Sequence, residues 1–414
     1  MKKDGIKLWK RDFSAFAAGM FLEYMSTAGM SFVLSLLILD ITKSVLLYGT
    51  YLVLYYMSSV FVPMLAGPLF EKYSKKKINS LCCVLSAAVY GGYLILYIIG
   101  KNHIAFTFLM AVLTGIFHAA FSVGANALML DVTEKESLQK AYSVFNVIET
   151  CSEITVPIVT VLYKSIGLEI ILFSCVILFF VAAGVLLLVK NEHTGKSEGK
   201  TSYAGELRDG LKFVNKNRAY LTVCTAFLLC FMMSGVRRTV WLPYFQNGSE
   251  NSYLWYFVMY GLFSTGLFHS SLLMYFRKTK KNGRYLLSVV SFAILCAGTV
   301  GVIFVPKIGG AVLAYFAGLS FGIFSNTSSV SVYAELDEGQ RARFSGIFTA
   351  FTNAGIVVGM ASASVLSEVM DLRGVIAVLG ALVFAVFAVL FFGIRRKGVK
   401  KLYYSCSAPC TDSK

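Results

Sequence analysis

Three glutamates stand inside long apolar stretches of the sequence. Glu23 lies near the middle of an apolar run over residues 13–38, and Glu149 and Glu153 lie near the middle of another over residues 140–163. An ionisable side chain is expensive to insert into hydrocarbon, so each one is a functional candidate by default. We therefore treat these carboxylates as candidate sites for a proton or another coupling cation.

Glu149 and Glu153 are four residues apart and share one face of a helix, which Asn146 extends. Two carboxylates this close in a low dielectric repel each other, which favours a proton on one of them. Such a pair can load and release a proton. Two alternatives stay open: the carboxylates bond neighbouring helices together, or they lie at a water-filled mouth. For Glu23 a simple polar contact between helices is an equal alternative to proton binding.

Histidines and arginines add further candidates for proton or anion chemistry. His118 and His269 lie deep in apolar runs, where a lone histidine is more often a satisfied core residue than a proton relay. Arg237 and Arg238 stand near the end of the run over residues 219–243, where charged heads commonly snorkel to the membrane surface. The functional alternative is that one of these arginines neutralises an intramembrane glutamate or an anionic substrate.

Twelve apolar runs must position these side chains. A membrane-spanning helix needs about 20 apolar residues, and each run reaches about that length. The composition agrees, with 57% hydrophobic and only 14% charged residues. The sequence thus predicts an all-α integral membrane protein with twelve transmembrane helices, over residues 13–38, 46–70, 78–99, 104–129, 140–163, 168–189, 219–243, 253–276, 284–305, 308–333, 344–367 and 374–394.

The basic residues are divided unevenly between the two sides of this arrangement. The two termini and every second connection, with their flanking residues, hold 31 of the 38 Lys and Arg residues. Positive charge next to a span marks the cytoplasmic side, so we expect a multi-pass protein of the cell membrane with both termini in the cytoplasm. The net charge of +16 is explained by this bias, and we expect no nucleic acid partner.

The longest connection divides the chain into two halves of six spans. We expect an N-terminal bundle over residues 1–189, a cytoplasmic linker over 190–218, a C-terminal bundle over 219–394 and a cytoplasmic tail over 395–414. Within the linker, apolar residues from Tyr203 to Val214 recur on one helical face, which predicts an amphipathic helix along the membrane surface. A shift of about 203 residues lays the halves on each other, for example Phe145 on Phe348. The bundles are therefore predicted to be pseudo-symmetric.

The short basic turn after the second run carries a specific resemblance. Its sequence, Gly67-Pro-Leu-Phe-Glu71-Lys72-Tyr-Ser-Lys75-Lys76-Lys77, resembles the loop 2–3 signature of the major facilitator superfamily. Three further stretches resemble its drug and macrolide exporter branch: Glu23-x-x-Ser26-x-x-Gly29, Asn126-Ala-Leu through Asp131 to Ala141, and Glu206-Leu-Arg-Asp-Gly210-Leu-Lys-Phe-Val214. The resemblance covers nearly the whole length.

The resemblance also implies a gate. Glu71 would meet the amino-terminal end of the helix near Phe344, where the helix dipole and Arg341 or Arg343 favour an anion. The alternative is a solvated carboxylate beside lysines. The expected gating residues are Gly67, Glu71, Lys72, Lys75, Lys76, Arg341 and Arg343.

These features predict a secondary active transporter that works by alternating access. The favoured activity is export of a small amphiphilic molecule, drug-like or cationic, by an antiporter coupled to protons. Its expected transport residues are Glu23, Glu149, Glu153, His118, Asn146 and Arg237. The alternatives are uptake of a nutrient or peptide by the same fold, and a non-transporting membrane receptor or scaffold.

No catalytic triad order, metal cluster or phosphate cradle occurs in the sequence, so we expect no enzyme, cofactor or metal. The expected partners are the substrate, the coupling ion and membrane lipid, with the protein a monomer.

Overall fold

The structure is a computed structural model that describes residues 8–133, 137–190, 217–246, 252–276, 283–333, 336, 338–393 and 396–405. Within the helices it leaves out some side chains, among them those of residues 64–72, Asn146, Glu153, Arg341 and Arg343. The regular secondary structure of the described part of the chain is helical, and this part contains no strand. It divides into two compact units, Met1–Tyr203 and Ala204–Lys414.

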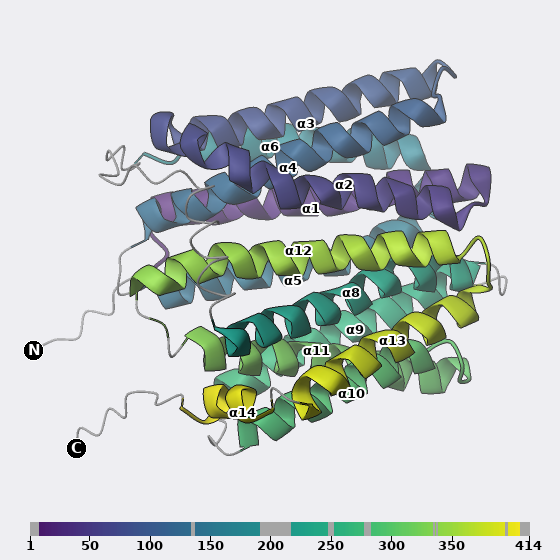
Figure 1. Ribbon diagram of the computed structural model, residues 1–414. Helices are drawn as coiled ribbons and strands as arrows, with labels where there is room; N and C mark the ends of the chain where they lie inside the picture. Colours follow the sequence, from purple (N-terminus) through teal and green to yellow (C-terminus); the bar gives the residue numbers. More distant parts are fainter. Residues whose placement is uncertain are drawn as a thin grey trace, which may run out of the picture. The chain divides into compact units, whose positions relative to one another are not determined.

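The first unit contains six long helices (Figure 1). They are α1 (Arg11–Thr42), α2 (Val45–Lys72), α3 (Lys75–Ile98), α4 (Ile104–Val132), α5 (Leu138–Ile166) and α6 (Leu168–Leu187). Helix α1 packs against α2, α4, α5 and α6. Because α1 has neighbours along so much of its surface, it can hold a polar side chain away from solvent.

The second unit repeats this pattern and adds a short helix. Its long helices are α8 (Arg218–Gln246), α9 (Ser252–Phe276), α10 (Arg284–Gly301), α11 (Lys307–Tyr333), α12 (Glu338–Leu366) and α13 (Leu372–Phe392). The short α14 (Arg396–Ser405), yellow in Figure 1, packs against α8, α10, α11 and α13. The twelve long helices correspond one to one with the twelve predicted runs, so the twelve-helix membrane fold is confirmed.

Length and composition agree with membrane insertion. Among the described residues, eleven helical stretches are long and apolar enough to cross a membrane. Helix α14 was not predicted, because residues 395–414 were expected to form a cytoplasmic tail. The predicted amphipathic helix over residues 203–214 lies outside the described residues.

Close helix contacts in both units depend on glycine. In the first unit a Cβ atom on Gly115 of α4 would lie 2.5 Å from the Tyr55 carbonyl oxygen of α2. In the second unit a Cβ atom on Gly359 of α12 would collide with the Met232 carbonyl of α8. Small residues allow such close backbone approach between membrane helices, where packing drives association.

Candidate functional site

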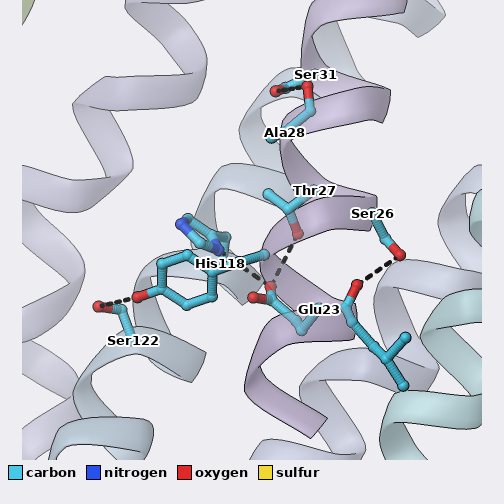
Figure 2. Close-up of polar contacts among 9 residues, drawn as sticks. Glu23, Ser26, Thr27, Ala28, Ser31, His118 and Ser122 are labelled. Carbon is cyan, nitrogen blue, oxygen red and sulfur yellow. Dashed lines mark hydrogen bonds and ion pairs between the residues drawn. The ribbon is translucent and has the colours of Figure 1, made fainter. Parts of the chain in front are cut away.

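Glu23 of α1 forms the centre of the candidate site in the first unit. The residue is only 2% exposed. Its Oε1 atom accepts a hydrogen bond of 2.9 Å from the Thr27 hydroxyl and lies 3.0 Å from Nδ1 of His118 (Figure 2). Its Oε2 atom is buried and has no hydrogen-bond partner among the described residues. One oxygen is therefore fixed in place, while the other can accept a proton.

The local sequence explains how these groups meet. Thr27 follows Glu23 by four residues, so its side chain lies one turn above the carboxylate on the same helical face. His118 comes from α4, which packs against both α1 and α2. Gly115, one turn before His118, permits the close contact between α4 and α2.

Aromatic rings enclose the imidazole of His118. The Tyr24 ring meets it edge to face with a centroid distance of 5.2 Å, and the Tyr55 ring stacks on it at 6.2 Å. Phe121 and Phe145 pack around Tyr24 in turn. These rings cover part of the imidazole with apolar surface, and the lower local dielectric strengthens the interaction of the carboxylate with the imidazole.

The two partners differ in accessibility. The His118 side chain is 25% exposed, whereas that of Glu23 is 2% exposed. The imidazole thus lies between the buried carboxylate and the accessible side of α4. An imidazole can take up a proton at one ring nitrogen and release one at the other, so this arrangement can carry a proton to a buried acid.

Glu149 of α5 is placed differently from Glu23. It is exposed in this structure, and its charge is close enough to act on both Tyr24 and His118. Of the predicted stripe on α5, the side chains of Asn146 and Glu153 are outside the description, so their pairing with Glu149 stays a prediction. The pair that the structure brings together is Glu23 with His118. This pairing was not predicted, because the two residues are 95 positions apart.

A second buried charge occurs in the other unit. Arg237 of α8 is 2% exposed, so it does not snorkel to the membrane surface. Its guanidinium carbon lies 3.9 Å from the ring centre of Phe263, 4.4 Å from that of Tyr260 and 5.4 Å from that of Trp241. We call these three rings the aromatic cage. Arg238 is only partly buried.

His269 does not join either buried cluster. It is exposed on α9, and its Nδ1 atom lies 2.9 Å from the Tyr315 hydroxyl of α11. His269 thus has a partner on a neighbouring helix but is not the buried core histidine that its place in an apolar run predicted.

The lysines of the basic turn bond to neighbouring helix ends. Lys75 forms an ion pair of 2.6 Å with Asp131 at the end of α4. Lys76 donates a hydrogen bond of 2.6 Å to the carbonyl of Val189, just after α6. Both lysines thus tie together the helix ends of their own unit. The side chains of Gly67, Glu71, Lys72, Arg341 and Arg343 are not described, so the gate that uses them stays a prediction.

Comparisons with known proteins place this fold. Residues 16–336 match the Major Facilitator Superfamily. No curated protein sequence matches the chain. Among solved structures, a mutant of the nucleoside transporter NupG is similar with a TM-score of 0.73 at 15% identity, over 91% of this chain and 99% of that one.

A bacterial homologue of the human lysosomal transporter Spinster, in its inward-facing and occupied conformation, is also similar. Its TM-score is 0.63 at 12% identity, over 95% of this chain and 92% of that one. At such identities the likeness concerns the fold alone. The superfamily match, however, spans well over half of the sequence. The chain therefore belongs to the Major Facilitator Superfamily of membrane transporters.

Proposed function

We propose that this transporter couples the movement of a small amphiphilic molecule to the movement of protons, with Glu23 and His118 as the proton-binding pair. The observation that carries the proposal is the buried carboxylate of Glu23, with one oxygen held by Thr27 and His118 and the other without a partner among the described residues. A lone buried carboxylate is costly unless it is neutralised or paired. Protonation of the pair removes that cost.

The pair can exist in two charge states. With one proton added, a charged imidazole faces a charged carboxylate, or a neutral imidazole faces a carboxylic acid. Without that proton, the pair carries a net negative charge on a carboxylate that is almost fully buried, which is unfavourable. The pair should therefore release its proton when water or a cationic group reaches it, and this links proton release to a change of conformation.

Export is the direction that the resemblance to the drug and macrolide exporter branch favours. Glu149, exposed on α5, adds a second acidic group near the pair and would help to attract a cationic group of an amphiphile. Uptake is the second candidate, because one similar fold is that of a nucleoside transporter. Both candidates keep the predicted orientation, with the basic connections and both termini in the cytoplasm.

A transport assay in liposomes tests the coupling. The purified protein is reconstituted with a pH-sensitive dye inside, and tetraphenylphosphonium, phenylacetate and uridine are added in turn as probes. We expect at least one probe to drive a pH change that the Glu23→Gln variant does not show. The matched control is Glu169→Gln, which neutralises an exposed carboxylate at the start of α6 in the same unit.

The outcome also separates the two candidate directions. Because each probe is added outside, a rise of the internal pH on probe entry indicates proton exchange, as coupled export requires. A fall of the internal pH on probe entry indicates co-transport with protons, as coupled uptake requires. If Glu23→Gln and its control show equal coupled pH changes, the proton-binding role of Glu23 is wrong.

The predicted gate is tested in the same assay. The Glu71→Gln variant is expected to transport more slowly while it inserts into the membrane in normal amounts. Normal turnover in this variant would remove Glu71 from the gate.

A further inference from the structure

The guanidinium of Arg237 is buried with unused hydrogen-bonding capacity. Its Nε and Nη1 atoms have no hydrogen-bond partner among the described residues. The aromatic cage offers cation–π attraction, which is stronger for a desolvated cation than for an exposed one. Ring faces do not replace the in-plane hydrogen bonds of a guanidinium, however, and a buried N–H without a partner is unfavourable, most of all on a charged group.

The helices of the second unit carry no carboxylate that could serve as the missing partner. From residue 204 onward, every Asp and Glu lies in a connection, in the tail or at the first residue of a helix. These residues are Glu206, Asp209, Glu250, Glu335, Asp337, Glu338, Glu368, Asp371 and Asp412. Arg237 stands 19 residues after the start of α8 and nine before its end, so it is well inside the apolar part.

We propose that Arg237 is the binding residue for the carboxylate of an amphiphilic substrate whose apolar body packs on the aromatic cage. A guanidinium matches a carboxylate through two parallel hydrogen bonds. The cage supplies flat apolar surface directly beside the charge: Tyr260 and Phe263 lie on one face of α9, and Trp241 lies one turn after Arg237 on α8. An aromatic monocarboxylate combines both features.

The Trp241 ring of the cage is oriented by a hydrogen bond to another helix and by a contact with Phe263. The Trp241 indole nitrogen donates a hydrogen bond of 3.3 Å to the Thr299 carbonyl of α10, and its ring meets that of Phe263 edge to face. Gly235, two residues before Arg237, brings α8 against α12, because a Cβ atom there would collide with the Ile356 carbonyl. The site is therefore preorganised on packed helices, as a ligand site requires.

This inference rests on the proposed transport function and narrows its substrate. Because Arg237 is closed off in this structure, its ligand must enter in another conformation of the transport cycle, as alternating access allows. The substrate would carry an anionic group, alone or with a cationic one, and a purely cationic amphiphile would be a poor fit for the site.

The fluorescence of Trp241 reports ligand binding at the cage directly, so the site can be tested without a transport assay. The sequence contains three tryptophans, so the Trp9→Phe/Trp255→Phe variant reports on Trp241 alone. In the purified full-length protein, phenylacetate, benzoate and indole-3-acetate are titrated while Trp241 emission is followed, with emission changes of free tryptophan subtracted. Phenylacetamide is the matched neutral probe. We expect a saturable change with at least one carboxylate and none with the amide.

The Arg237→Met variant tests the residue itself. It keeps an unbranched apolar stem, so we expect it to fold with a melting temperature equal to or above that of the parent protein, because a buried charge without an anion is unfavourable. Its response to the carboxylates should weaken at least tenfold, whereas Arg238→Met should keep the response within about twofold. Arg237→Lys keeps the charge but loses the planar pair of donors, and we expect intermediate affinity.

Three results would overturn the inference. They are no response to any of the three carboxylates, an unchanged response in Arg237→Met, and a clear fall in the melting temperature of Arg237→Met without anion, since that fall means the guanidinium serves only the fold. Proton coupling is read separately with Glu23→Gln, so failure of the anion site leaves the proposed proton pair intact, and failure of proton coupling leaves the binding titration interpretable.

Discussion

The two units share a helical pattern but bury opposite charges. In the first unit a carboxylate and an imidazole meet inside the bundle, whereas in the second a guanidinium stands among aromatic rings. In the register of the sequence repeat, about 203 residues, Glu23 corresponds to Ala226 and His118 to Phe321, while Arg237 corresponds to Leu34. Neither polar site has a counterpart in the other unit.

We interpret this contrast as one duplicated scaffold that carries the two binding roles proposed above. The backbone contacts that glycine permits recur in both units, so they belong to the fold. The buried charges do not recur, so we attribute them to what each unit binds. A proton suits a carboxylate with an imidazole beside it, and an organic anion suits a guanidinium beside flat rings.

The largest effect is expected when the proton pair is broken but its hydrogen bond is kept. His118→Asn can still donate to Glu23, yet an amide cannot carry a proton at neutral pH. We expect coupled proton movement to fall about 100-fold, the lower end of what a positioned proton-transfer group contributes. The liposome pH assay measures this loss.

The control for that variant is His269→Asn, which changes the exposed histidine of α9. Its coupled proton movement should stay within about twofold of the parent protein. Equal losses in the two variants would contradict a special role for His118.

Moving the charge to the other unit tests whether the cage is needed. Leu34 of α1 is fully buried and corresponds to Arg237. An arginine near the centre of a membrane helix costs about 3 kcal/mol, so we expect Leu34→Arg to destabilise the protein by about that amount in thermal unfolding in detergent. If Leu34→Arg loses no more stability than the conservative Leu34→Met, a buried arginine is tolerated in this fold without an aromatic cage.

Replacing Gly115, whose close contact with α2 helps to position His118, should lower the stability of the protein moderately. Gly115→Ala puts a Cβ atom 2.5 Å from the Tyr55 carbonyl oxygen, and overpacking of this kind costs about 1–3 kcal/mol. Gly92→Ala on α3 is the matched control, because nothing lies within 4 Å of its added Cβ atom. The melting temperatures of both variants are compared by thermal unfolding. If Gly92→Ala is as unstable as Gly115→Ala, the close contact with the Tyr55 carbonyl does not explain the loss of stability.

The smallest effect concerns α14, the short helix at the end of the second unit. The Tyr403 hydroxyl donates a hydrogen bond of 2.7 Å to the Ser328 hydroxyl of α11. Tyr403→Phe should therefore cost about 1 kcal/mol in thermal unfolding at pH 7.

The same tyrosine predicts a pH dependence. Burial raises the pKa of Tyr403 from 10.0 to about 12, so the neutral phenol is favoured in the folded state. Its contribution is complete below pH 10 and is lost as the pH rises from about 10 to about 12, because the unfolded chain ionises first. The stability difference between parent and Tyr403→Phe should shrink in that range. A difference that stays constant to pH 12 would contradict a buried phenol.

The long helices could be predicted because hydrocarbon thickness sets their length. The span predicted over residues 104–129 corresponds to the helix Ile104–Val132, and the span predicted over 168–189 corresponds to Leu168–Leu187. Helix α14 was missed because it is only ten residues long. Its buried residues Val399, Leu402 and Tyr403 follow a helical spacing, which was the signal available in the sequence.

The site was predictable in its residues but not in its pairings. The cost of burying charge singled out Glu23 and Arg237. Sequence spacing can pair residues only within one helix, however, and so it favoured Glu149 with Glu153 over Glu23 with His118. The contact between α1 and α4 depends on packing that no local pattern specifies.

The protonation of Glu23 itself is the most direct test of the account. Infrared difference spectra of the purified protein, recorded during a pH titration, report the carbonyl stretch of protonated carboxylic acids. We predict a titrating band that disappears in Glu23→Gln and shifts in position or midpoint in His118→Asn. A set of titrating bands identical in the parent protein and Glu23→Gln would contradict the claim that this buried carboxylate exchanges a proton.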